Sequence, residues 1–131
     1  MICERPPAPT KSRQARGRTN YHAGQAAEQI VQRKYEMAGY KLAAKRWRGK
    51  SGEIDLVMAR DGLFAFIEVK SSKSHDAAAM LLGPRQQARL LHAASEFMAK
   101  ADPMTRCDVR MDVALVDQRG RTKFLQNAIG H

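Results

Sequence analysis

Two strand-like runs within residues 53–70 meet at an Asp-Gly pair, and this feature constrains the fold more than any other part of the chain. Asp61 and Gly62 suit the two positions of a tight hairpin turn, because both tolerate the positive φ angles that such a turn requires. With these two residues as the loop, Arg60 lies opposite Leu63 and the register of the whole ladder is set. The sequence therefore predicts an antiparallel hairpin.

The predicted register gathers charge at the open end of this hairpin. It places Asp55 opposite Glu68 and Glu53 opposite Lys70, and directly opposed residues share a face of the sheet with Cβ atoms roughly 5 Å apart. Glu68 and Lys70 are two positions apart on one strand, so they also share that face. We therefore expect two carboxylates and an ammonium group to converge at one end of the sheet.

Both faces of the predicted hairpin are apolar. One face carries Val57, Ala59, Phe64 and Phe66 together with the charges, and the other carries Ile54, Leu56, Met58, Ala65, Ile67 and Val69. A hairpin that is apolar on both sides is buried on both sides, and an unpaired charge is strongly unfavourable in such a place. The two carboxylates therefore need a partner.

A divalent cation between Asp55 and Glu68 would let both carboxylates stay ionised. Oxygen ligands in small number suit Mg²⁺ or Mn²⁺, so the pair predicts a metal site. A Glu-x-Lys triplet alone carries little information, because glutamate and lysine often alternate on exposed strands. The opposed aspartate, the hairpin turn and the two apolar faces favour the functional interpretation.

The chain has 131 residues, enough for one domain, and a formal net charge of +10 with a pI near 10.1. Five of the 23 basic residues and one of the 13 acidic residues fall within residues 1–20, which leaves 18 against 12 and a net charge of +6 on the rest. The body of the chain is itself basic, and we expect a polyanionic partner.

Residues 1–20 have the composition of a basic disordered leader, with three prolines and few large apolar side chains. They lack the apolar centre of a secretory signal peptide, and no run of about 18 apolar residues occurs along the chain. Neither Cys3 and Cys107 nor the four histidines have the spacing of a disulfide framework or a zinc site. We therefore expect a cytoplasmic protein with free thiols and no membrane association.

Apolar periodicity places the other elements. A helix is predicted over residues 21–38, closed by Gly39, and a second helix begins at Pro84. Glu28 lies beside the apolar stripe of the first helix, at a boundary position where most glutamates are solvated. Strands are predicted over residues 40–48, 109–116 and 122–129, the last at a sheet edge. The two helix stripes are Ala23, Ala26, Ala27, Ile30, Val31, Lys34 and Ala38, and Gln87, Leu90, Leu91, Ala94, Phe97, Met98 and Ala101.

Basic residues are densest over residues 41–50, and a second group begins the helix that starts at Pro84. For that second group a solvated helix face is an equally good explanation. Trp47 could stack on a base, but we favour a core position for it. We expect Asp112 to be the buried partner of a nearby base rather than a metal ligand. The residues assigned to nucleic-acid contact are Lys45, Arg46, Arg48, Lys50, Lys73, Arg85, Gln86 and Arg89.

The order helix, strand, hairpin, helix, strand resembles the core of PD-(D/E)XK nucleases. Over residues 23 to about 116 the chain is similar to the YraN-type family of uncharacterised bacterial proteins. The matching residues are Ala27-Glu28, Gly39-Tyr40, Arg46-Trp47-Arg48, Gly52-Glu53-Ile54-Asp55-Leu56-Val57, Phe66-Ile67-Glu68-Val69-Lys70 and Met111-Asp112-Val113. The GEIDLV and FIEVK pair is specific, whereas the other matches are weak alone. Ser72 and Gln86 depart from the family, where basic residues are common, and this weakens phosphate contacts at those positions.

The resemblance implies a single α/β nuclease domain over residues 21–131, with a restriction-endonuclease-like core: a mixed central sheet, an antiparallel hairpin and flanking helices. It also implies that Glu28 joins the site, as in archaeal Holliday-junction resolvases of similar fold. The catalytic residues would then be Glu28, Asp55, Glu68 and Lys70. In this hypothesis Asp55, Glu68 and the Val69 carbonyl hold Mg²⁺ or Mn²⁺, and Lys70 orients the water that hydrolyses a phosphodiester bond.

Several substrates and two other classes of function stay open. Nucleic acid is the expected partner, with DNA favoured, but DNA or RNA, junction, flap or single strand all fit a basic nuclease-like core. A junction-cutting enzyme would be expected to work as a homodimer. A non-catalytic nucleic-acid-binding protein that keeps the fold is the alternative, and a scaffold for an acidic protein is a third. The intact acids and lysine favour the enzyme, because a binder gains little from two buried carboxylates near an anion.

Overall fold

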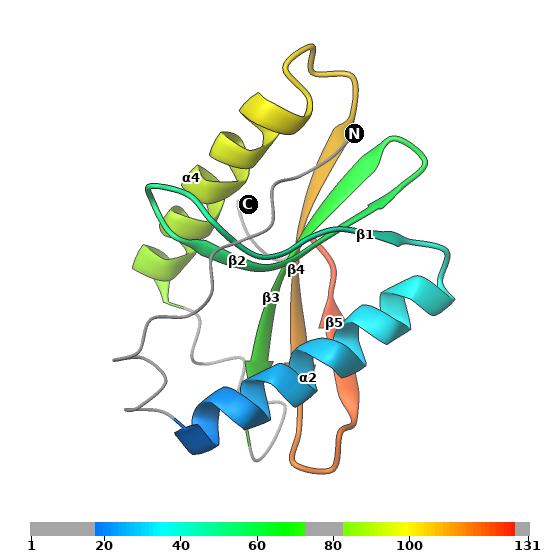
Figure 1. The fold of residues 1–131 in the computed structure, drawn as a ribbon, viewed down its shortest axis with the longest axis vertical. Coiled ribbons are helices and arrows are strands. Elements are labelled where there is room, and N and C mark those ends of the chain that lie inside the picture. Colours follow the sequence, from blue (N-terminus) through cyan, green and yellow to red (C-terminus); the bar gives the residue numbers. More distant parts are fainter. Residues whose placement is uncertain (1–17, 73–82, 128–131) are drawn as a thin grey trace.

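The computed structural model describes residues 18–72 and 83–127, with side chains from Gly24 onward. This part of the chain forms two helices and five strands (Figure 1). In chain order they are α2 (Arg18–Met37), β1 (Lys41–Arg48), β2 (Glu53–Arg60), β3 (Leu63–Ser71), α4 (Pro84–Ala101), β4 (Asp108–Val116) and β5 (Thr122–Leu125). The predicted helices and strands are all present, although α2 begins three residues earlier and β5 ends four residues sooner than expected.

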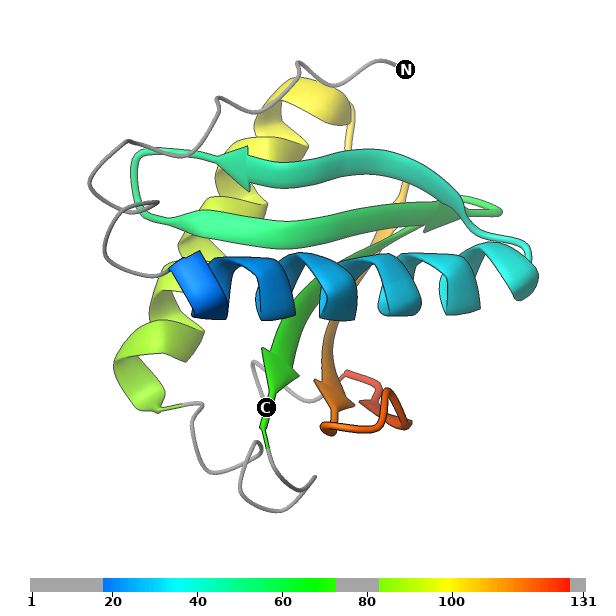
Figure 2. The ribbon, with the colours of Figure 1, turned by 60° about the horizontal axis from the view of Figure 1, so that its bottom comes forward.

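The five strands lie side by side in chain order and form a mixed sheet. β1, β2 and β3 make an antiparallel meander, β3 and β4 are parallel, and β5 pairs antiparallel with β4 at the edge. A parallel pair needs a crossover connection, and this connection contains α4. α2 packs on one face of the sheet and α4 on the other (Figure 2). This architecture is consistent with the restriction-endonuclease-like core that we expect from the sequence.

The register of the hairpin is confirmed next to its turn, and the ladder then ends earlier than predicted. Both residues of the turn at 61–62 have positive φ, and Arg60 pairs with Leu63. The last paired residues are Leu56 and Ile67. Two predicted pairs therefore lie beyond the ladder: Asp55 with Glu68, and Glu53 with Lys70. The reason is that β2 continues to pair with β1 as far as its first residue while it separates from β3.

Residues that alternate along the strands enter two separate cores. Phe97 of α4 lies in one of them, and its ring contacts Trp47, Phe64 and Phe66 edge-to-face with centroid distances of 5.4–5.7 Å. Trp47 is therefore a core residue, as predicted. The core beneath α2 includes Ala27, Val31, Tyr35, Leu56, Met58, Ala65 and Ile67. Burial on both faces explains why the hairpin is apolar on both sides.

Ile54 lies in the core beneath α4, whereas strict alternation predicts it on the face of Leu56. The cause is in β1, where Arg46 has a φ of 52°. A residue in this left-handed region interrupts the two-residue alternation of a strand. Trp47 consequently packs on the same side as Ala44, and Ile54, the ladder partner of Trp47, goes with it. The prediction for Ile54 was wrong because it assumed regular strands.

The buried face of α2 is rotated from the predicted stripe. Two polar contacts account for the rotation: Glu28 reaches Arg46, and the hydroxyl of Tyr35 donates to Asp112 at 2.7 Å. Apolar periodicity cannot detect either contact, so this part of the prediction was wrong. The buried residues of the helix are Ala27, Glu28, Val31 and Tyr35, and three exposed members of the predicted stripe are Ala26, Lys34 and Ala38.

Asp112 on β4 is fully buried and surrounded by donors. Arg110 donates to it through Nε and Nη2 at 2.8–3.1 Å, and the N–H of Asn127 donates at 3.0 Å. With the hydroxyl of Tyr35 these groups neutralise the carboxylate, which confirms Asp112 as the buried partner of a base. Burial and the bond to Asp112 raise the pKa of Tyr35, and the bond to Asp112 raises the pKa of Arg110.

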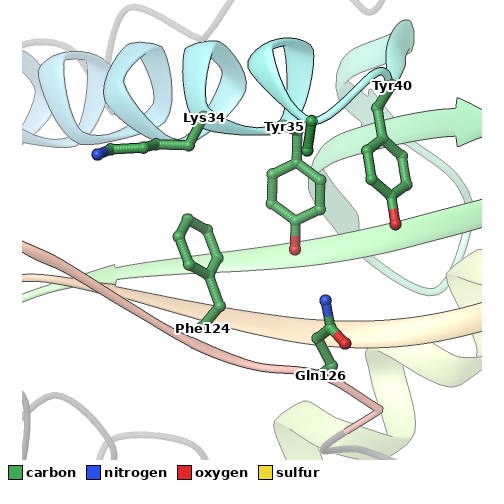
Figure 3. Close-up of a pocket in the computed structure, with 6 residues that line it drawn as sticks. Lys34, Tyr35, Tyr40, Phe124 and Gln126 are labelled. Atoms are coloured by element: carbon green, nitrogen blue, oxygen red, sulfur yellow. The ribbon is translucent and has the colours of Figure 1, made fainter.

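A pocket of about 130 Å³ lies beside this network, between α2 and β5. Its walls are mainly aromatic: the ring of Tyr35 meets the rings of Tyr40 and Phe124 edge-to-face. Both tyrosine hydroxyls already have partners inside the protein. The lining residues are Lys34, Tyr35, Ala38, Tyr40, Phe124 and Gln126 (Figure 3). None of the four predicted catalytic residues lines this pocket.

Some predictions concern residues outside the described ranges. These are residues 1–17 of the predicted leader, with Cys3, and the assigned nucleic-acid contact Lys73. Cys107 is described and is a free thiol, as expected. Across the described residues, neither helix is both long enough and apolar enough to span a membrane.

Candidate carboxylate site

The candidate site begins where β2 separates from β3. If pairing continued, the N–H of Val69 would donate to the carbonyl of Ile54. Instead, Oδ2 of Asp55 accepts this hydrogen bond at 2.8 Å. A carboxylate thus replaces a main-chain acceptor at the end of the ladder, so the N–H is satisfied although the strands have parted. This bond fixes Asp55 against β3.

Glu68 and Lys70 of β3 meet Gln86 from the first turn of α4. Nζ of Lys70 lies 3.1 Å from Oε2 of Glu68, and the two side chains are 19% and 7% exposed. Nε2 of Gln86 donates to the same Oε2 at 2.5 Å, and Oε1 of Gln86 accepts from Nζ of Lys70 at 3.3 Å. The three side chains therefore form a closed triangle of contacts.

Asp55 and Glu68 repel each other electrostatically. Burial raises the pKa of Asp55 well above its usual range, and the negative charges of Glu68 and Glu28 raise it further. The hydrogen bond from the N–H of Val69 acts in the opposite direction but does not cancel these effects. Within residues 24–72 and 83–127, no cationic side chain forms an ion pair with Asp55. The pair therefore favours a bound proton or an added cation.

Glu28 approaches the site from α2 and is buried, not solvated as its helix position suggests. It is 8% exposed, and Nε of Arg46 donates to its Oε1 at 2.9 Å. Burial raises the pKa of Glu28, while the hydrogen bond and charge of Arg46 lower it. Glu28 is close enough to Asp55 for its charge to affect the pKa of that residue. The structure thus brings Glu28 to the other acids with its own counter-ion attached.

The oxygen donors of the site suit a small, hard cation with few protein ligands. Oδ2 of Asp55 and Oε2 of Glu68 are engaged in the contacts above, and the two carboxylates lie close enough to share a hydrogen bond, whose proton a bound cation would replace. Among the described side chains, no three His, Cys, Asp or Glu residues form a group that could hold a metal ion. Water and main-chain oxygen would have to complete the coordination shell, as is common for Mg²⁺.

The basic residues assigned to nucleic-acid contact in and after β1 have different surroundings. Arg46 points inward to Glu28 and its side chain is only 15% exposed. Arg48 is exposed and lies 3.5 Å from Glu53. Lys50 is exposed in the β1–β2 turn, whereas Lys45 is half-buried. The structure therefore brings Arg46 into the carboxylate site and leaves Arg48 and Lys50 at the surface.

Glu96 of α4 fixes the turn between β1 and β2. Its two carboxylate oxygens accept hydrogen bonds from the N–H groups of Lys50 and Ser51 at 2.8 and 3.0 Å. These bonds lower the pKa of Glu96. Gly49 is required beside them, because a Cβ there would lie 2.7 Å from Oε1 of Glu96 and 2.8 Å from the ring of Trp47. The turn is thus held against α4.

This attachment places the basic residues of α4 next to the turn. A Cβ on Gly52 would lie 3.5 Å from Cβ of Arg89. Arg85 and Arg89 are one helical turn apart and both are exposed. They therefore border the same part of the surface as Lys50. Gln86, on the same helical turn as Arg85, contacts the carboxylate site instead.

Sequence reasoning missed the partners of three site residues. The contact of Arg46 with Glu28 joins residues 18 apart, and that of Gln86 with Glu68 joins residues on separate elements. Glu96 and the turn that it binds are 45 residues apart. The one available signal was the departure of Gln86 from the resembling family, because an uncharged amide can donate and accept at once.

Comparison with known proteins places this architecture in a family. A family model described as "Uncharacterised protein family UPF0102" matches residues 27–116, a range that contains every residue of the carboxylate site. A UPF0102 protein of Roseobacter denitrificans is 47% identical over 120 residues, which are 92% of this chain and 93% of that protein. UPF0102 proteins of Ruegeria pomeroyi and Cereibacter sphaeroides are 46% and 50% identical, over 92% and 86% of this chain and 98% and 96% of theirs. The chain therefore belongs to the UPF0102 family, to which the YraN-type proteins belong.

Proposed function

We propose that this protein is a metal-dependent nuclease that hydrolyses phosphodiester bonds of nucleic acid. The observation that carries the proposal is the proximity of Asp55 and Glu68, whose charges oppose each other beside the ammonium group of Lys70. Holding like charges together destabilises a folded protein unless a cation or proton joins them. Two acids and a lysine at a gap in a buried sheet are therefore arranged for chemistry with an anion.

Each residue of the site has a role in this proposal. Asp55, Glu68 and the carbonyl of Val69 would hold Mg²⁺ or Mn²⁺, which supplies an acidified water and positive charge beside the scissile phosphate. Lys70 would orient the attacking water and offset the negative charge that develops on the phosphate. Glu28 would add a further oxygen donor if Arg46 turned away from it. Arg46 would then contact the phosphate.

The exposed basic residues next to the site would hold the nucleic-acid backbone. Arg48, Lys50, Arg85 and Arg89 lie around the β1–β2 turn and the start of α4, and the chain has a net charge of +10. Such groups contact phosphate rather than base edges, so they favour affinity without sequence preference. DNA is the favoured substrate, and branched DNA is one candidate form of it.

A nucleic-acid-binding protein without hydrolytic activity is the second candidate function. One observation favours it: Glu28 is already neutralised by Arg46, so only Asp55 and Glu68 are left as acidic ligands. Such a protein would keep the basic surface and use the acids only for structure.

Cleavage assays with metal and without it separate the two candidates. The purified protein is incubated with branched, duplex and single-stranded DNA and RNA, each with Mg²⁺, Mn²⁺ or EDTA. We expect cleavage only with a divalent cation, and Lys70→Ala should reduce it by about 100-fold or more. Asp55→Asn should not cleave, yet it should bind nucleic acid without metal at least as well as the parent, because one repulsive charge is gone.

Lys123→Ala is the matched control, since Lys123 is an exposed lysine on β5. It should cleave like the parent. If Lys70→Ala and Asp55→Asn also cleave like the parent, a contaminating nuclease is responsible and the proposal fails. If the parent binds tightly but cuts no substrate with either metal, the binding function replaces it.

A further inference from the structure

Gln86 is an uncharged side chain that joins two charged groups of the site. Its Nε2 donates to Oε2 of Glu68 at 2.5 Å, and its Oε1 accepts from Nζ of Lys70 at 3.3 Å. An amide can do both, whereas a lysine has no acceptor and an ionised glutamate has no donor. Gln86 therefore fits this place by its chemistry.

The contacts of Gln86 restrict how Glu68 can bind a cation. Gln86 and Lys70 both hold the same oxygen, Oε2. Only Oε1 is then left for a further ligand, so the carboxylate cannot give both oxygens to one ion. Asp55 is less restricted, because its Oδ2 accepts one hydrogen bond, from the N–H of Val69, and keeps a second lone pair. Glu68 is thus the acid prepared to act as a one-oxygen ligand.

One-oxygen ligands discriminate between the common divalent cations. Ca²⁺ takes about six to eight oxygens at about 2.3–2.6 Å and readily accepts both oxygens of a carboxylate. Mg²⁺ requires a near-octahedral shell at about 2.0–2.1 Å, keeps several waters and uses one or two carboxylates. A carboxylate that offers a single oxygen therefore gives Ca²⁺ fewer ligands than it readily accepts. The same carboxylate still meets the needs of Mg²⁺.

We propose that Gln86 is a positioning residue that makes the carboxylate site selective for Mg²⁺ over Ca²⁺, by holding Glu68 as a one-oxygen ligand. This inference rests on the proposed metal-dependent function. Asp55 is held by the main chain, so among the two acids only Glu68 can be released by changing a side chain on another element. Lys70 contacts Oε2 from a long, flexible stem, whereas Gln86 reaches it from the first turn of a helix.

Calorimetric titration of the intact protein with MgCl₂ and with CaCl₂, without nucleic acid, tests the proposal. Gln86→Leu removes the donor and the acceptor while keeping a similar volume. We expect Mg²⁺ affinity to fall by about tenfold or more, the usual effect of losing a residue that orients a metal ligand. Ca²⁺ affinity should fall less, because Glu68 could then offer it both oxygens, so the ratio of Mg²⁺ affinity to Ca²⁺ affinity should decrease. Gln86→Glu should lower the same ratio, because it adds a carboxylate and repels Glu68 from its present position.

Gln29→Leu is the matched control, because it makes the same change at an exposed position of α2. Its ratio of affinities should equal that of the parent. Thermal unfolding establishes that each variant is folded, and Gln86→Glu decides the question if Gln86→Leu does not fold.

Two results would overturn the proposal in different ways. If the parent binds Mg²⁺ but both Gln86 variants keep its ratio of affinities, Gln86 does not set selectivity, and the proposed function stands. If the parent binds neither cation, the proposed metal-dependent function fails and the inference fails with it.

Discussion

Two acids of the same sheet, the fully buried Asp112 and the half-buried Asp55, have opposite electrostatic surroundings. Asp112 receives the guanidinium of Arg110, a tyrosine hydroxyl and a main-chain N–H, so its charge is balanced on the spot. Asp55 receives one main-chain N–H and lies next to the negative charges of Glu68 and Glu28. The charge of Asp112 is neutralised, whereas Asp55 lies beside other negative charges.

Asp112 has more hydrogen-bond partners than Asp55, but an unsatisfied buried atom is not what distinguishes the two acids. Throughout the described residues, no buried side-chain nitrogen or oxygen atom lacks a partner. The two acids therefore differ mainly in the charges around them. These charges indicate a structural or a functional role more directly than the number of hydrogen bonds does. A buried acid with a cationic partner stabilises the fold. An acid that lies beside other carboxylates is stable only when a proton or a cation is bound.

The largest expected effect is on stability when each aspartate becomes asparagine. Asp112→Asn should lower the free energy of unfolding by about 2–4 kcal/mol, because it leaves the mostly buried guanidinium of Arg110 without a counter-ion. Asp55→Asn should change it by less than about 1 kcal/mol or raise it, because repulsion is relieved. Urea denaturation measures both values. Equal losses in the two variants would make Asp55 a structural residue and remove the contrast.

An intermediate effect is expected from pH in the absence of divalent cations. The raised pKa of Asp55 means that the folded protein holds this proton more tightly than the unfolded chain does. Between pH 3.8, the ordinary pKa of aspartate, and the raised pKa, the free energy of unfolding should therefore fall as pH rises. The parent should show this decline relative to Asp55→Asn, and Mg²⁺ should reduce it. Denaturation curves across the acidic range measure it, and a pH-independent difference would contradict the assignment.

The smallest expected effect concerns an exposed pair. Arg48 is 43% exposed and lies 3.5 Å from Glu53, so Arg48→Ala should change the free energy of unfolding by less than about 0.5 kcal/mol. If the proposed nucleic-acid surface is correct, the same variant should bind nucleic acid more weakly and with a shallower dependence on salt. Urea denaturation and salt titrations of binding measure the two effects. A stability loss comparable to that of Asp112→Asn would show that the exposure of Arg48 does not predict its contribution to the free energy of unfolding.

Features set by neighbouring residues could be predicted from the sequence. The Asp61-Gly62 turn and the periodic stripe of α4 depend on local chemistry, and both are found. The end of the ladder could not be predicted, because either the Asp55 carboxylate or a main-chain carbonyl can accept the hydrogen bond from Val69, and the sequence does not show which one does. That one choice separates β2 from β3 and creates the gap where the acids meet.

The contacts between elements were equally hidden from the sequence. The buried face of α2 depends on two polar partners, Arg46 and Asp112, which lie on strands distant in the sequence. The periodicity of apolar residues does not predict that a glutamate or a tyrosine on such a helix is buried. The resemblance to a known family did point to Glu28, but it could not reveal that Arg46 forms an ion pair with Glu28.

The edges of the sheet bear on how the protein behaves at high concentration. β1 forms one edge, and its pairing is irregular between Leu42 and Ala44 and again interrupted by the φ of Arg46. It also carries charged side chains along its length. The opposite edge, β5, is only four residues long. Irregular, charged or very short edge strands are poor templates for a strand of another molecule. The same arginine that holds Glu28 therefore helps to keep copies of this sheet from joining edge to edge into aggregates.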